Sequence, residues 1–271
     1  MRNLTATLCL TIAVLLGSMG MSTSADLRKG VTAYKSGDYA TALREWTPLA
    51  EQGNATAQYL LGLMFANGNG IPQNDKTAVK WLGLAAKQGH AGSQYILGVM
   101  YANGQGVSQD NKTAMKWWKF AAEQGYANAQ FNLGLMYSKG DGVPQDNKTA
   151  VKWYRLAAEQ GNAESQYNLG HMYYAGNGVP QNHKIAMKWY RLAAKHGFAD
   201  AQGNLGALYA FGNGVQKDYV RAHMWGNIAA TNGNKLGAKL RDDFEKKMTP
   251  AQIAKAKKLA KECIRKKYKG C

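Results

Sequence analysis

A period of 36 residues constrains this chain more than any other feature of its sequence. A glycine closes each copy at this spacing, with no insertion or deletion, at Gly53, Gly89, Gly125, Gly161, Gly197 and Gly233. A fixed period of this length is typical of proteins in which each copy is one supersecondary unit that packs against the next copy. The sequence therefore predicts a stack of similar units that share one elongated core.

The first half of each copy predicts a helix with a glycine on its buried face. Leu133 and Tyr137 are four residues apart, so they share one face of a helix. Gly134 lies between them, although glycine inside a helix costs about 1 kcal/mol relative to alanine. The same position is also glycine in the other copies: Gly62, Gly98, Gly170 and Gly206. The recurrence indicates that the next helix approaches too closely for a Cβ atom.

The second half of each copy predicts a turn and a second helix. Gly140 and Gly142 permit positive φ and so end the first helix. Asp146 is a favoured N-cap residue for the second helix, and we expect Trp153 on its buried side. The equivalent N-cap positions are Asn74, Asp110, Asn182 and Asp218. Each copy is therefore predicted to be a helix–turn–helix hairpin, which gives an all-α fold.

The pattern A-x-A-Q-x-x-L-G-x-x-Y, followed by G-x-G-V and W-x-x-x-A-A-x-x-G, resembles the Sel-one-like repeat (SLR), a relative of the tetratricopeptide repeat. The resemblance covers residues 54–233. It implies a right-handed α-solenoid of five repeats, over 54–89, 90–125, 126–161, 162–197 and 198–233. It also implies a non-enzymatic role as a protein-interaction scaffold or regulatory adaptor.

Residues 1–25 predict a secretory signal peptide. Arg2 supplies positive charge, residues 8–16 form a short apolar run, and small residues precede Asp26. We expect export to the periplasm or the exterior of the cell. A signal anchor that stays attached is the alternative.

The two ends of the stack depart from the repeat. Residues 26–53 predict a shorter capping hairpin of the tetratricopeptide type, with Trp46 one position later than the repeat tryptophan. Residues 234–271 predict a basic helical cap, because residues 235–271 hold 13 Lys or Arg against 4 Asp or Glu, a net charge of +9 out of +17 for the chain. Cys263 and Cys271 are predicted to form a disulfide in an oxidising compartment, with two free thiols as the alternative.

No sequence motif predicts chemistry. The chain carries no phosphate-binding lysine loop and no His-Glu-x-x-His motif, and its five histidines fall at different repeat positions. We therefore expect no cofactor, no metal site and no enzyme activity. An envelope hydrolase built from residues that stacking brings together is a weak alternative.

The resemblance places the first helices on a concave surface, so the predicted site is a partner-binding groove there. An aromatic residue follows the repeat glutamine in four of the five repeats, and polar residues lie nearby. The predicted groove residues are Tyr59, Tyr95, Phe131, Tyr167, Asn132, Asn168, His171, Tyr174 and Lys139. Rings supply contact area and amides can bond a peptide backbone. The alternative is that the aromatic residues form the core between repeats.

The positive charge suggests a second class of partner. The basic cap, together with lysines that recur before each repeat tryptophan, could attract anionic lipid or glycan. We expect no nucleic-acid partner for an exported protein.

Overall fold

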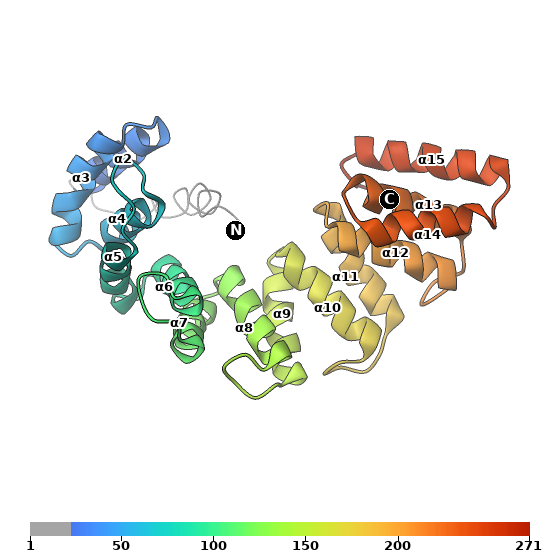
Figure 1. Cartoon of the computed structure of the whole chain (residues 1–271), viewed down its shortest axis with the longest axis horizontal. Helices are drawn as coiled ribbons and strands as arrows, with labels where there is room; N and C mark the ends of the chain where they lie inside the picture. The colour runs from blue at the N-terminus through green and yellow to red at the C-terminus, as the bar shows by residue number, and fades with distance from the viewer. Residues whose placement is uncertain (1–22) are drawn as a thin grey trace. The chain divides into compact units, whose positions relative to one another are not determined.

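The computed structural model of the chain describes residues 23–271, and every regular element in this range is an α-helix (Figure 1). The helices are α2 (Thr23–Lys35), α3 (Tyr39–Glu51), α4 (Ala55–Asn67), α5 (Asp75–Lys87), α6 (Ala91–Asn103), α7 (Asn111–Glu123), α8 (Ala127–Lys139), α9 (Asn147–Glu159), α10 (Ala163–Ala175), α11 (His183–Lys195), α12 (Ala199–Phe211), α13 (Tyr219–Thr231), α14 (Lys235–Glu245) and α15 (Pro250–Arg265). The predicted signal peptide lies outside the described residues except for its last three positions, which belong to α2.

The helices group into two compact units, and the division between them falls after Ala129 in the sequence. In the first unit, which we call unit 1, helices α2 to α7 each pack against the next helix along the chain. In unit 2, α9 to α13 do the same, and α14 and α15 both pack against α13. The predicted all-α solenoid of hairpins with a 36-residue period is confirmed, because the contacts run between successive helices.

The predicted helix caps are present in the structure. The Asp146 side chain accepts hydrogen bonds from the backbone N–H of Lys148 (2.9 Å) and of Thr149 (3.1 Å). The equivalent side chains also cap their helices: Asn74, Asp110, Asn182 and Asp218. These bonds satisfy backbone donors that the first turn of a helix leaves free.

The Gly-x-Gly turn has two separate roles. Its first glycine, such as Gly104 with φ of 69°, ends the first helix in the left-handed region. Its second glycine, Gly106, lies against the start of the second helix of the preceding repeat. A Cβ on Gly106 would lie 2.5 Å from the carbonyl of Asp75. Because it lacks a Cβ atom, the second glycine lets the turn of one hairpin pack closely against the second helix of the preceding hairpin.

The glycine inside the first helix makes room for one large side chain in every hairpin except the last, where Gly206 faces backbone atoms of Ala222 and Gly226. A Cβ on Gly134 would lie 2.6 Å from Cδ1 of Tyr154, which comes from the second helix of the same hairpin. The same contact recurs between Gly30 and Trp46, Gly62 and Leu82, Gly98 and Trp118, and Gly170 and Tyr190. The predicted close approach is confirmed.

The expectation that Trp153 lies on the buried side is wrong by one residue. Trp153 is only half-buried, whereas Tyr154 is 2% exposed. One residue turns a helix by about 100°, so the side chain that points at the glycine is the one after the repeat tryptophan. Trp46, which looked displaced in the sequence, occupies this buried position and is 0% exposed. The cap therefore packs in the same register as the repeats.

A ladder of buried amides joins consecutive repeats. The Gln94 side chain donates to the carbonyl of Ala86 in the preceding repeat (3.1 Å) and accepts from Gln124 at the end of its own hairpin (2.7 Å). Matching side-chain pairs are Gln58 with Gln88, Gln130 with Gln160, and Gln202 with Asn232. In the remaining repeat His196 occupies the position of the second partner, and Oε1 of Gln166 accepts no hydrogen bond from residues 23–271.

The C-terminal helices have the predicted start signals. Thr249 and Gln252 form a reciprocal capping box, with Pro250 in the first turn of α15. Ala256, Ala260 and Cys263 are buried. Residues 234–271 thus cover the end of α13 with a helix that is apolar on one side and basic on the other.

We predict that Tyr154 stabilises its hairpin more than Trp153 does. Tyr154→Ala should lower the free energy of unfolding by about 3–5 kcal/mol, because it leaves a cavity against Gly134. Gly134→Ala should cost about 1–3 kcal/mol by overpacking. Trp153→Ala should cost about 1–2 kcal/mol, because the ring is half-buried. Urea unfolding followed by circular dichroism measures all three, and a larger loss for Trp153→Ala than for Tyr154→Ala would contradict this packing.

We also predict a pH-dependent contribution from His90. Its Nδ1 caps α6 by accepting from the backbone N–H of Ser93 (3.1 Å), and burial lowers the pKa of His90 to about 4. The unfolded chain, with an ordinary pKa of 6.5 at this site, takes up a proton between pH 6.5 and 4, and the folded chain does not. The stabilisation is therefore complete above pH 6.5 and is lost as pH falls to 4, by at most about 3 kcal/mol.

The variant His90→Asn tests this effect, since asparagine caps the equivalent helix at Asn54 and does not titrate. Urea midpoints at pH 7 and pH 4.5 should differ less for His90→Asn than for the wild type. His196→Asn, at an exposed histidine, is the control and should keep the wild-type difference. If the urea midpoint falls equally between pH 7 and pH 4.5 in the wild type and in His90→Asn, His90 does not have this role.

Candidate functional site

The predicted aromatic residues of unit 1 lie between repeats. Tyr59 is 1% exposed and stacks on His90, with ring centroids 4.5 Å apart. Tyr95 is half-buried and packs against Tyr126 of the next repeat at 5.0 Å. Tyr59 therefore offers no surface to a partner, and we remove it from the predicted groove. The physical reason is that its ring fills the junction between two hairpins.

The aromatic residues of unit 2 lie in equivalent places but keep part of their surface. Phe131 packs against Tyr154 with centroids 6.1 Å apart. Tyr167 packs between Tyr190 (5.8 Å) and Phe198 (5.0 Å). Phe131 and Tyr167 are both half-buried. Each ring therefore contributes to the core on one side and to the surface on the other.

The predicted amides of unit 2 line up with a third one. Asn132 and Asn168 are half-buried, and so is Asn204, which follows at the same 36-residue spacing. Side-chain hydrogen bonds join Asn204 to Tyr167 and Tyr190. Asn204 is absent from the predicted groove, although its 36-residue spacing from Asn168 indicates the equivalent position. In unit 1 the same position holds buried Leu60 and Ile96.

The remaining predicted residues are exposed. His171 and Tyr174 lie on α10, three residues apart and so on one face, and Tyr174 is 38% exposed. The Tyr174 ring lies 5.1 Å from that of His183. Lys139 is exposed in the last turn of α8. We call Asn132, Asn168, Asn204, His171 and Tyr174 the amide face of unit 2.

The amide face can form hydrogen bonds and apolar contacts. Desolvation by burial raises the pKa of the Tyr190 hydroxyl, so this hydroxyl stays protonated at neutral pH.

Within residues 23–271 no group of three or more His, Cys, Asp or Glu is arranged to hold a metal ion. In the same range, no helix combines the length and apolar character that crossing a membrane requires.

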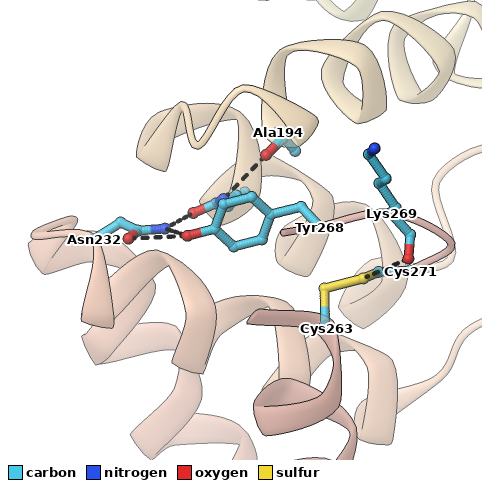
Figure 2. Close-up of a disulfide and its surroundings, with 7 residues drawn as sticks. Ala194, Asn232, Cys263, Tyr268, Lys269 and Cys271 are labelled. Carbon is cyan, nitrogen blue, oxygen red and sulfur yellow. Dashed lines mark hydrogen bonds between the residues drawn. A yellow bond between two sulfur atoms is a disulfide. The ribbon is translucent and has the colours of Figure 1, made fainter. Parts of the chain in front are cut away.

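The structure joins Cys263 to Cys271 by a disulfide (Figure 2). The loop that it closes carries Tyr268, whose hydroxyl accepts a hydrogen bond from Nδ2 of Asn232 (2.9 Å). Asn232 also donates to Gln202 (2.8 Å), which in turn donates to the carbonyl of Ala194 (3.2 Å). The C-terminal loop therefore extends the amide ladder of the last repeat.

Comparison with known proteins identifies the repeat. The Sel1 repeat model matches five segments of the chain, over residues 55–90, 91–126, 127–162, 163–198 and 199–234. The chain belongs to the Sel1 repeat family. Sel1 repeat proteins are generally protein-interaction scaffolds and are typically non-catalytic.

Several solved structures of Sel1 repeat proteins are similar to this chain. A Sel1 repeat protein from Oxalobacter formigenes is 32% identical, with 87% of this chain and 96% of that chain covered and a TM-score of 0.75. A protective antigen of uropathogenic Escherichia coli with an SLR fold is 28% identical over 91% of this chain and 70% of its own, with a TM-score of 0.44. Helicobacter pylori cysteine rich protein B is 26% identical over 49% of this chain and 96% of its own, with a TM-score of 0.40. No curated protein matches the chain.

We predict that the disulfide stabilises the end of this Sel1 solenoid. Cys263→Ser with Cys271→Ser should lower the free energy of unfolding by about 2–3 kcal/mol, because the bridge restricts a short loop in the unfolded chain. Urea unfolding measures the loss. Alkylation of the native protein followed by mass spectrometry should label neither thiol before reduction. Labelling of both thiols without a reductant would contradict the bridge.

Proposed function

We propose that this Sel1 repeat protein is a non-enzymatic scaffold of the cell envelope that binds an extended segment of a protein partner on the amide face of unit 2. The observation that carries the proposal is the row of amides at Asn132, Asn168 and Asn204. Unit 1 fills this position with buried apolar side chains, so packing of the repeat does not require an amide there. Amides that packing does not require at this position, above all Asn132 and Asn168, are available for recognition.

The chemistry of the amide face suits a peptide in extended conformation. Each amide side chain can donate and accept a hydrogen bond, as each peptide unit of the ligand can. The half-buried rings of Phe131 and Tyr167 lie one residue before Asn132 and Asn168 and offer apolar area at low entropic cost. His171 and Tyr174 add exposed contact surface at the centre of unit 2.

Placement in the envelope rests on the predicted signal peptide and on the disulfide. Disulfides persist in oxidising compartments and are rare in the cytosol. Both features favour an exported protein.

Capture of partners from an envelope extract of the source cells tests this proposal. The face variant carries Asn168→Ala, His171→Ala and Tyr174→Ala. The control variant carries Lys148→Ala, Lys152→Ala and Glu159→Ala, at exposed positions of α9 in the preceding repeat. Both variants should keep the helical circular dichroism and thermal midpoint of the wild type.

At physiological salt, proteins retained by the wild type should bind the face variant at least about tenfold more weakly, because a few contacts dominate the affinity of an interface. The control variant should retain them. Equal retention by the face variant and the wild type would overturn the proposed site.

A further inference from the structure

We propose that a second surface of unit 2 binds an acidic segment of a protein partner, in which carboxylate side chains alternate with apolar ones. The surface is formed by two adjoining pockets of about 450 and 440 Å³, which share Arg191, Lys195 and Val215. We call it the cationic cleft. The inference rests on the proposed scaffold function but uses residues outside the amide face.

The cleft collects positive charge, and four of its five cations belong to one helix. Lys184, Lys188, Arg191 and Lys195 follow one another at spacings of three or four residues, so they form one face of α11. Arg221 of α13 is the fifth cation. None of the described residues that line the two pockets is Asp or Glu.

Few carboxylates of the chain compete for these cations. Within residues 23–271, no carboxylate lies within 4.0 Å of the four cationic groups of α11, and Arg221 pairs only with Asp218, at 3.5 Å. Clustered charge of one sign attracts a ligand of the opposite sign and favours its association.

A buried tyrosine holds the two arginines in place. Nη2 of Arg191 donates to the hydroxyl of Tyr209 (2.7 Å), and the guanidinium of Arg221 lies over the Tyr209 ring, 5.6 Å from its centroid. Tyr209 is 3% exposed, so its ring is fixed by packing. Arginines that are already oriented can bind a carboxylate through two parallel hydrogen bonds at lower entropic cost.

The preceding repeat shows that the repeat itself does not require this charge. There, Arg155 donates to a tyrosine hydroxyl in the same way, at 2.6 Å. The positions of Lys195 and Arg221, however, carry Glu159 and Ile185. Lys195 and Arg221 thus add two cations to the three that recur one repeat earlier as Lys148, Lys152 and Arg155.

The C-terminal loop forms one wall of the cleft. Tyr268, Gly270 and Cys271 line the pocket that contains Arg221. The disulfide with Cys263 and the hydrogen bond between Tyr268 and Asn232 hold this loop against the end of the solenoid (Figure 2). The wall is therefore anchored at both of its ends.

The dimensions of the cleft suit an extended peptide better than a single phosphate group. Cations three or four residues apart on a helix rise about 4.5–6 Å, and the row from Lys184 to Lys195 spans roughly 16 Å. Alternate side chains of an extended chain are about 6.6–7 Å apart. Carboxylates at every second residue can thus reach cations along the row through the flexible lysine side chains, beside the apolar lining at Val215.

Fluorescence anisotropy with the purified full chain tests the proposal. The probe is a labelled peptide of about ten residues in which glutamate alternates with valine, and lysine replaces glutamate in the control peptide. The cleft variant, Lys195→Glu with Arg221→Ile, restores the residues of the preceding repeat. The charge-matched control, Lys258→Glu with Lys261→Gln, lowers the net charge equally at exposed positions of α15.

At physiological salt the acidic peptide should bind the cleft variant at least about tenfold more weakly than the wild type, and the charge-matched control should change by less than about twofold. Replacing both cysteines by serine should also weaken binding. Absence of binding to the wild type, or equal losses in both charge variants, would overturn the proposal. So would displacement of the peptide by inorganic phosphate, heparin or phosphatidylglycerol vesicles at equal charge concentration, which would assign the cleft to another anion.

The face variant separates this inference from the proposed function. It should bind the acidic peptide with wild-type affinity, because its substitutions lie outside the cleft. If the acidic peptide does not bind but the face variant still loses the captured partners, only the cationic cleft is overturned. If the peptide binds as expected but the wild type and the face variant capture partners equally, only the amide face is overturned.

Discussion

Five of the six hairpins formed by α2 to α13 depend on a large side chain that packs against a glycine of the preceding helix. Tyr154 fits against Gly134 so closely that a single methyl group on the glycine would overlap the ring. The partner of the glycine varies among Trp46, Leu82 and Tyr154, while the glycine stays. The contact sets the distance between the two helices, and that distance brings the caps, turns and amides of each copy into register with the next.

The connections between hairpins combine apolar and aromatic packing with polar and backbone contacts. Gly106 lies against the backbone at Asp75, and Gln94 bonds both the preceding repeat and the end of its own hairpin. Such connections tolerate changes on the outer faces of the helices. Unit 2 uses this freedom twice, since it carries amides such as Asn168 where unit 1 is apolar, and cations such as Arg221 where other repeats carry uncharged residues. Both proposed binding surfaces lie at positions that the stack does not need for packing.

Local features were predictable residue by residue. The N-cap at Asp146, the capping box at Thr249 and the positive φ of Gly140 follow from side-chain chemistry and backbone sterics within a few residues. The buried register of the second helix was not predictable from the tryptophan pattern. Trp153 and Tyr154 are both large, and only the position of Gly134 on the facing helix decides which one is enclosed. The same reason removed Tyr59 from the predicted groove, because His90 of the next repeat covers its ring.

The sequence by itself determined the all-α class, the 36-residue hairpin and its caps, because these depend on periodicity and on contacts within one turn of the chain. Only the tertiary structure decided which aromatic residues are enclosed. It also decided that Arg191 and Arg221 meet on Tyr209 and that the C-terminal loop closes one wall beside them. These residues lie on different helices, and their distances are set by how the hairpins stack. A one-dimensional pattern specifies each helix face but not which face of a neighbour it meets.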